Sequence, residues 1–421
     1  MKHYDIPLPG VQRTAPETTD SPIQMKYDVE QQGYIVEEYY ISGQADTYES
    51  VTMSDSMNRE EQDPTKSMAR RHFNRPVIKA DVPYTTRILV HRPKDPVKFS
   101  GNVVIETVHP MGGGVLAVFG TARPFFLDNG DVYVGVQHPS TFAVLKKFNE
   151  KRYSALNMPD FTQLWGSLAQ IGALLKSDRA ANPLHGLNVR YLFMTGISYT
   201  GVATATFANY HHISAKLNDG RNIFDGYVPI ANAMYNRPLN VPTIRIVTQS
   251  DYGTLGGLGN RRPDSDEPGS QYRLYEIPGA PHAAIPPKLE PGEVPSDFPN
   301  GIFYGAAFKN LYNWVRGGSS PPKGRYITTD ADGNTKTDKH GNAVGGLRSP
   351  YVDIPIAKYD VKGLLGYKVP FDAAKKKSLY GTHENFVMKV EDATRKLIWQ
   401  RLILPAGALV IINHARNSEM F

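Results

Sequence analysis

The chain has no cysteine among its 421 residues. This absence excludes disulfide bonds, thiolate metal sites and a cysteine nucleophile. Long apolar runs are missing as well, since none approaches the roughly 18 residues that predict a membrane span. The N-terminus also lacks the apolar core of a secretory signal peptide. We therefore expect a soluble, cytoplasmic protein, and a trimmed secreted chain is the alternative that the same features allow.

A strong charge of one sign is also lacking. The formal net charge is +6, and hydrophobic and charged residues make up 40% and 21% of the chain, as in ordinary globular proteins. The basic residues are scattered and form no stripe with interleaved aromatics, so we expect no nucleic-acid partner. Residues 330–338 resemble a calcium loop without its terminal glutamate, and no H-E-x-x-H motif occurs. We therefore expect no metal, no other cofactor and no membrane partner.

The sequence does contain an alternation of strand and helix patterns. Apolar, β-prone stretches predict strands at residues 33–42, 83–91, 102–108, 131–136, 189–194, 224–230, 243–247 and 272–277. Apolar residues at helical spacing predict helices at 161–177, 303–315 and 391–403, and residues 407–415 predict a further, buried helix. Polar composition indicates loops at 52–76 and 317–346. The alternation is typical of an α/β protein with a mostly parallel central sheet and helices on both faces.

The most informative segment surrounds Ser198. A predicted strand ends at Gly196-Ile197-Ser198, and a small-residue, helix-like segment begins directly after it. A serine at a sharp strand-to-helix turn is the arrangement of a nucleophile elbow, usually spelled G-x-S-x-G. Here Thr200 stands where the second glycine is expected, and glycine follows at Gly201. The alternative interpretation is an ordinary β-α turn in which the serine caps the helix.

A serine nucleophile needs a base and an acid, which α/β proteins place after late strands. His282 follows the predicted strand 272–277 in a loop of proline, glycine and alanine, and is the candidate base. Asp251 follows the predicted strand 243–247 and is the candidate acid. Glu276 is a rival carboxylate, but its position in the middle of a predicted strand favours a buried, supporting role. The order Ser198, Asp251, His282 is that of α/β-hydrolases.

An oxyanion hole requires two N–H donors. The backbone amide of Tyr199 is the first candidate, and the second is expected from the glycine-rich loop 109–114, which contains His109, Met111 and Gly112. The alternative is that this loop has no catalytic role. Two further residues at strand ends, His138 and Tyr252, are with Tyr199 candidates for the wall of the substrate pocket.

These segments resemble the α/β-hydrolase-domain proteins of esterase type. The resemblance extends over nearly the whole chain and rests on residues 33–43, 83–93, 101–106, 151–156, 276–282, 314–322 and 341–348. It implies that Ser198 is the nucleophile and His282 the base of a serine hydrolase. The chain departs from the family in having Ser198-Tyr199-Thr200 where serine-glutamine-serine is frequent, and Gln249 where a glutamate is frequent.

The expected function is hydrolysis of a carboxylic ester through an acyl-enzyme on Ser198, with a small ester-like molecule as substrate. Lactone opening, acyl transfer and carbon–carbon bond cleavage remain alternatives on the same residues, and a non-catalytic binding protein is an alternative of another class. We expect a single α/β-hydrolase domain over residues 1–421. Within it, residues 1–80 form an N-terminal β extension and loop, 81–317 the catalytic core, and 318–421 a C-terminal elaboration with candidate lid elements.

Overall fold

The computed structural model of the chain describes residues 6–14, 28–50, 76–111, 114–232, 234–251, 261–283 and 285–420. The chain divides into two compact units. The first comprises Met1–Pro229 with Tyr235–Val241, and the second comprises Ile230–Met234 with Pro242–Phe421. The single domain expected for residues 1–421 stays a prediction, and the loop expected at 52–76 lies, except for its last residue, outside the described residues.

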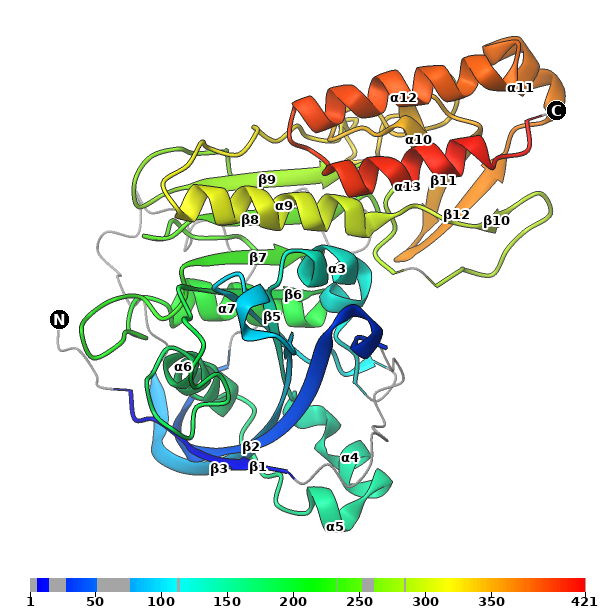
Figure 1. Cartoon of the computed structure of the whole chain (residues 1–421). Helices are drawn as coiled ribbons and strands as arrows, with labels where there is room; N and C mark the ends of the chain where they lie inside the picture. The colour runs from blue at the N-terminus through cyan, green and yellow to red at the C-terminus, as the bar shows by residue number, and fades with distance from the viewer. Residues whose placement is uncertain are drawn as a thin grey trace. The chain divides into compact units, whose positions relative to one another are not determined.

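The strands of the first unit combine an antiparallel and a parallel part. They are β1 (Gly10–Arg13), β2 (Tyr34–Tyr48), β3 (Val77–Pro93), β4 (Asn102–Thr107), β5 (Val132–Val136), β6 (Tyr191–Ile197) and β7 (Gly226–Ile230) (Figure 1). Their spatial order is β1-β2-β3-β5-β4-β6-β7. Pairing is antiparallel from β1 through β3 to β5, whereas β4 pairs parallel with both β5 and β6. The predicted, mostly parallel core with an N-terminal β extension is confirmed, and the strands of the extension pair antiparallel.

The parallel strands β4, β5 and β6 are buried along nearly their whole length. All six residues of β4 are buried, as expected for a central strand that is covered on both faces. The helices of this unit are α3 (Ala117–Asp128), α4 (Phe142–Phe148), α5 (Glu150–Tyr153), α6 (Gln163–Leu175) and α7 (Tyr199–Tyr210). Among the residues that the structure describes, 3-10 turns lie at η1 (Glu30–Gln32), η2 (Pro96–Lys98) and η4 (Pro139–Thr141).

Helix α6, which the sequence predicts at residues 161–177, packs closely on β2. A Cβ added at Gly166 would lie 2.8 Å from the Cβ of Ala45, so glycine at this position permits the close approach. Apolar side chains of α6 such as Leu168 and Ile171 are fully buried in the core of the first unit. The loss of apolar surface to water is the main favourable contribution to such a core.

The second unit has its own strands and helices. Its strands are the parallel pair β8 (Thr243–Thr248) and β9 (Tyr272–Ile277), and a small antiparallel sheet in the order β10 (Val294–Pro295), β12 (Leu365–Pro370), β11 (Ala357–Lys362). Its helices are α9 (Asn300–Val315), α10 (Pro350–Asp353), α11 (Ala373–Tyr380), α12 (His383–Trp399) and α13 (Pro405–Arg416) (Figure 1). The strands predicted at 243–247 and 272–277 and the helix predicted at 303–315 are confirmed to within three residues. In the first unit, β2 ends six residues after its predicted end, and β3 begins six residues before its predicted start.

Two predictions for the C-terminal helices were wrong in detail. The helix expected at 391–403 begins at His383, because the Thr382 hydroxyl accepts a hydrogen bond from the backbone N–H of Asn385 and caps the helix there. It ends at Trp399. The helix expected to be buried at 407–415 buries one face only, since Leu409 and Val410 are 59% and 48% exposed. An apolar run therefore did not indicate complete burial.

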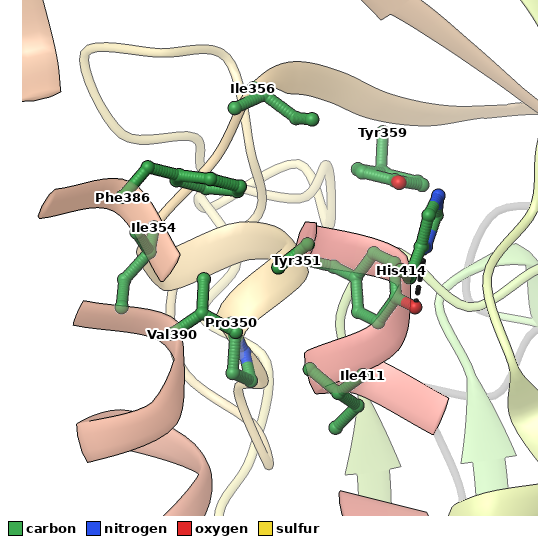
Figure 2. Close-up of a pocket in the computed structure, with 10 residues that line it drawn as sticks. Pro350, Tyr351, Ile354, Ile356, Tyr359, Phe386, Val390, Ile411 and His414 are labelled. Carbon is green, nitrogen blue, oxygen red and sulfur yellow. Dashed lines mark hydrogen bonds between the residues drawn. The ribbon is translucent and has the colours of Figure 1, made fainter. Parts of the chain in front are cut away.

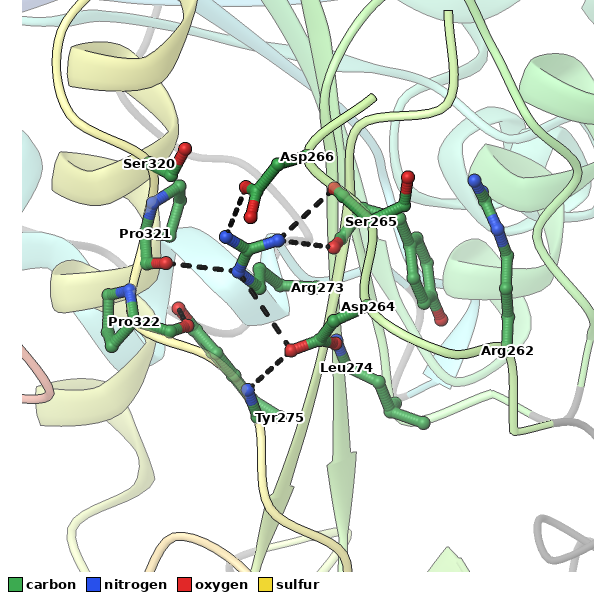
Figure 3. Close-up of polar contacts among 12 residues, drawn as sticks. Arg262, Asp264, Ser265, Asp266, Arg273, Leu274, Tyr275, Ser320, Pro321 and Pro322 are labelled. Carbon is green, nitrogen blue, oxygen red and sulfur yellow. Dashed lines mark hydrogen bonds and ion pairs between the residues drawn. The ribbon is translucent and has the colours of Figure 1, made fainter. Parts of the chain in front are cut away.

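The segment after α9 is attached to strand β9 by a buried arginine. Arg273 donates from Nε to the backbone oxygen of Pro321 at 3.0 Å and from Nη2 to Asp266 at 2.5 Å (Figure 3). The hydroxyl of Tyr275 donates to the backbone oxygen of Pro322 at 2.9 Å. These contacts fix the start of the region 318–421 against β9. No helix within the described part of the chain is long and apolar enough to cross a lipid bilayer.

Candidate active site

Ser198 occupies a strained turn between β6 and α7. Its backbone angles are φ 56° and ψ −122°, a conformation that residues with a side chain rarely adopt and that costs free energy. The serine side chain makes no capping hydrogen bond to the helix that follows. The alternative of an ordinary serine N-cap therefore does not describe this turn, and the backbone has the form expected of a nucleophile elbow.

The residues two before and two after Ser198 make the elbow possible in different ways. A Cβ added at Gly196 would lie 2.2 Å from the backbone oxygen of Thr200, so only glycine fits there. Thr200 itself is completely buried, and its hydroxyl donates to the backbone oxygen of Ile197 at 3.0 Å and accepts from its N–H at 3.1 Å. The threonine is therefore accommodated by two hydrogen bonds across the turn.

Two of the residues predicted to line a substrate pocket lie together beside the elbow. The ring centroids of His138 and Tyr199 are 5.2 Å apart in an edge-to-face arrangement, and the ring centroid of Phe161 lies 5.3 Å from that of His138. Tyr199 is 47% exposed, whereas His138 is almost completely buried. Burial lowers the pKa of His138 to about 4, so its imidazole is neutral at physiological pH.

The loop expected to supply an oxyanion donor is closed by a pair of backbone hydrogen bonds. His109 and Val115 donate to each other's backbone oxygens at 2.8 and 2.9 Å. The amide of Met111 donates to Nδ1 of His109 at 3.1 Å and is engaged in this conformation. Gly112 lies outside the described residues, as does Tyr252. The loop therefore has a defined base, set by His109 and Val115.

In the second unit, the predicted base and acid are directly paired. Nδ1 of His282 lies 2.7 Å from Oδ1 of Asp251, and Asp251 is completely buried at the end of β8. The other carboxylate oxygen of Asp251 accepts from the backbone N–H and the hydroxyl of Thr248 at 2.8 and 3.0 Å. The backbone N–H of His282 donates to Ser250 Oγ at 3.1 Å. These contacts hold the imidazole with Nδ1 directed at a carboxylate.

The two rival groups near this pair have other partners. Glu276 accepts from Nε and Nη2 of Arg261 at 2.8 and 2.9 Å and from the backbone N–H of Ile327 at 2.6 Å. The amide oxygen of Gln249 accepts from the backbone N–H of Gly279 at 2.7 Å. Glu276 therefore supports the segment after α9, and Gln249 links the turn after β8 to the loop that carries His282.

Sequence reasoning missed a second imidazole–carboxylate pair near the C-terminus. His414 contacts Asp297 through Nε2 at 2.9 Å and the hydroxyl of Tyr351 through Nδ1 at 2.8 Å. The ring of Tyr351 and His414 face an apolar cavity of about 30 Å³ that is also lined by Tyr359 and Phe386 (Figure 2). Substrate pockets usually measure roughly 300–1,000 Å³, so this cavity is too small for one. Burial raises the pKa of Tyr351, which makes its hydroxyl a poor nucleophile.

Sequence reasoning also missed Glu106, a completely buried carboxylate inside β4. The signal was present, because a charged residue interrupts the apolar run Val103-Val104-Ile105 just before the glycine-rich loop. A charge in a strand that is covered on both faces requires hydrogen-bond partners and therefore indicates a specific role. Among the described residues, no group of three or more His, Asp or Glu side chains is arranged to hold a metal ion.

The chain belongs to the α/β-hydrolase domain family, whose model matches residues 5–413. This match confirms the predicted fold class and the resemblance on which it was based. A comparison with curated proteins finds no match.

Several solved structures resemble parts of the chain. XC6422 from Xanthomonas campestris, an α/β serine hydrolase without a lid, is 13% identical over 46% of this chain and 78% of its own, with a TM-score of 0.27. A cold-adapted esterase from an Arctic intertidal metagenomic library is 8% identical over 60% and 87%, with a TM-score of 0.29. Est1E from Butyrivibrio proteoclasticus is 9% identical over 47% and 85%, with a TM-score of 0.28.

Proposed function

We propose that the chain is a serine hydrolase that cleaves a small carboxylic ester through an acyl-enzyme on Ser198. The observation that carries the proposal is the backbone of Ser198, whose positive φ is maintained in a residue that is not glycine. Such strain persists only where the surrounding structure imposes it, and it concentrates at functional sites. The paired His282 and Asp251 supply the base and the acid that a serine nucleophile requires.

The first half of the proposed reaction forms the acyl-enzyme. Nε2 of His282 accepts the proton of Ser198 as Oγ attacks the ester carbonyl carbon, and the carbonyl oxygen becomes an oxyanion. Asp251 accepts a hydrogen bond from Nδ1–H, which keeps Nε2 as the acceptor and stabilises the imidazolium that forms. The tetrahedral intermediate then expels the alkoxide, which takes the proton from His282 and leaves as an alcohol.

The second half releases the acid. His282 accepts a proton from a water molecule, whose oxygen attacks the acyl carbon, and the second tetrahedral intermediate expels Ser198. Ser198 recovers its proton from His282, so the net reaction is ester plus water to acid plus alcohol. The backbone N–H of Tyr199, at the first position of α7, is the proposed first oxyanion donor, and the second is assigned to the loop around Gly112.

The substrate pocket is proposed to include the aromatic cluster of His138, Phe161 and Tyr199. Its rings offer an apolar wall beside the nucleophile, and the exposed Tyr199 is its most accessible member. The neutral imidazole of His138 adds no charge to this wall. An uncharged acyl or alcohol group therefore suits the cluster better than a charged one.

A fluorophosphonate probe, which reacts with activated serines, tests the proposal. We expect labelling of the wild-type chain on the peptide that contains Ser198, no labelling of Ser198→Ala, and slow labelling of His282→Ala. Ser214→Ala is a matched control, because Ser214 donates to the backbone oxygen of His211 after the end of α7 and has no role in the proposed chemistry. Labelling of Ser198→Ala at the wild-type rate, or no labelling of the wild type, would disprove the proposal.

A further inference from the structure

Glu106 is a completely buried carboxylate that the proposed reaction does not use. It lies near the end of β4, where it pairs with Gly135 of β5 and Thr195 of β6. The residue precedes the loop 108–116 by two positions. Burying a carboxylate is costly unless hydrogen bonds compensate for the loss of water, so the partners of Glu106 indicate what it is for.

The partners of Glu106 are the first turn of α3 and a tyrosine. Oε1 accepts from the backbone N–H of Val118 at 2.9 Å, and Oε2 accepts from that of Phe119 at 3.1 Å. The hydroxyl of Tyr133 donates to Oε2 at 2.6 Å. The N-cap residue of α3, Leu116, makes no capping hydrogen bond. Glu106 therefore satisfies, from a neighbouring strand, the N–H groups that an N-cap side chain normally satisfies.

This contact determines where the loop 108–116 ends. The loop begins directly after β4, the strand that carries Glu106, and ends at the first turn of α3, which Glu106 binds. The hydrogen-bonded pair of His109 and Val115 closes the base of the loop. Leu116 packs against β5 at a point where a Cβ on Gly135 would lie only 2.7 Å from its Cδ2. A displacement of the α3 N-terminus would therefore shift Leu116 and the arm of the loop that precedes it.

We propose that Glu106 is a positioning residue for the oxyanion loop, which it holds in place by binding the N-terminus of α3. The proposal rests on the proposed function, since it assigns the second oxyanion donor to the loop 108–116. In its ionised form, the carboxylate also suits the positive end of the helix dipole. Glu106 makes contact with the helix and Tyr133, and it acts on the reaction only through the position of the loop.

The substitution Glu106→Gln tests this role, because it replaces one carboxylate oxygen, which accepts hydrogen bonds, by an NH2 group, which donates them. Burial raises the pKa of Glu106 to about 7, although the hydroxyl of Tyr133 and the N–H groups of α3 lower it. Tyr133 is the titratable group that contacts it from β5; His91 of β3 contacts the ring of Phe119 instead, and burial lowers its pKa to about 4. An ionised carboxylate accepts from both N–H groups. The amide of a glutamine would direct its NH2 group at one of them.

Glu106→Gln is compared with Glu276→Gln, the same substitution at an equally buried strand glutamate in the second unit. Two readouts are measured on the full chain: backbone amide hydrogen exchange by mass spectrometry, and kcat and KM for p-nitrophenyl acetate. We expect faster exchange across residues 108–119 and a kcat lowered by about 10-fold to 100-fold in Glu106→Gln, with KM changed much less, because the loss of a whole oxyanion donor costs about 10²–10³. Glu276→Gln should change neither.

The two readouts separate this inference from the proposed function. Unchanged exchange at 108–119 in a folded Glu106→Gln variant overturns the positioning role, whatever the activity does. Hydrolysis that survives in Ser198→Ala refutes the proposed function instead, and the exchange result still decides whether Glu106 holds the loop. If Glu106→Gln does not fold, Tyr133→Phe decides: we expect a smaller change in the same direction, and wild-type exchange and kcat overturn the proposal.

Discussion

Among its described residues, the second unit has two imidazole–carboxylate pairs with similar N–O distances but different surroundings. His282 and Asp251 are 2.7 Å apart, and His414 and Asp297 are 2.9 Å apart. The first pair is buried, with side chains 6% and 0% exposed, whereas both side chains of the second are 35% exposed. A hydrogen bond is electrostatically stronger where water is excluded, so the first pair holds its imidazole more firmly.

The pairs also differ in what the second nitrogen of the imidazole does. In His414, Nδ1 bonds the hydroxyl of Tyr351 while Nε2 contacts Asp297, so both nitrogens are engaged. Within the described ranges, the imidazole of His282 is hydrogen-bonded through Nδ1, and no hydrogen bond of its Nε2 is observed. A general base needs a nitrogen that is able to accept a proton. The comparison indicates that an engaged second nitrogen marks a structural pair, and an available one marks a candidate base.

The largest expected difference between the pairs concerns catalysis. Asp251→Asn should lower kcat for p-nitrophenyl acetate by about 10³-fold to 10⁴-fold, because an asparagine no longer holds the imidazole with Nε2 as the acceptor. Asp297→Asn should leave kcat near the wild-type value. Both variants are assayed at the same pH, with thermal unfolding measured in parallel to show that each is folded.

A second variant tests whether a carboxylate at position 249 can replace Asp251, because the family often has a glutamate at that position. We expect the double variant Asp251→Asn with Gln249→Glu to remain inactive, since the side chain of Gln249 is directed at the backbone N–H of Gly279. Recovery of activity in the double variant, or wild-type activity in Asp251→Asn, would remove Asp251 from the acid role.

The parts of the site that the sequence predicted are those that local patterns specify. The elbow at Ser198 was predictable because a strand, a glycine and a helix follow one another within a few residues. His282 and Asp251 were predictable because the carboxyl ends of neighbouring parallel strands bring such residues together. Their hydrogen bond is the observed consequence.

The parts that the sequence did not predict depend on contacts between distant segments. Tyr351 lies in α10 and His414 in α13, and the sequence pattern of neither helix predicts that they are in contact. The cap that Glu106 provides for α3 joins a strand to a helix across a loop. Exposure of Leu409 could not be foreseen either, because an apolar residue indicates burial only when the neighbouring elements are known.

The second expected difference concerns stability in acid. Burial alone would raise the pKa of Asp297, but hydrogen bonds from His414 and Lys368 outweigh it and lower the pKa below its ordinary value. A carboxyl group whose pKa is lower in the folded state stabilises the fold above its unfolded pKa, and this contribution disappears as the pH falls through the folded pKa. Thermal unfolding of the wild type should therefore shift to lower temperature below about pH 4. Asp297→Asn should be less stable than the wild type at pH 7, and acidification should lower its melting temperature by less. An identical pH dependence of the melting temperature in both proteins would contradict a lowered pKa of Asp297.

The smallest expected effect tests whether an engaged nitrogen is what separates the two pairs. Tyr351→Phe removes the hydroxyl that bonds Nδ1 of His414 and keeps the ring that lines the small apolar cavity (Figure 2). The loss of one partly buried hydrogen bond should lower the free energy of unfolding by about 1 kcal/mol. In the background of Ser198→Ala, the freed imidazole should confer no hydrolysis of p-nitrophenyl acetate, because no activated serine is proposed beside it. Activity that appears in this double variant and disappears again with His414→Ala would show that the second pair is a latent base.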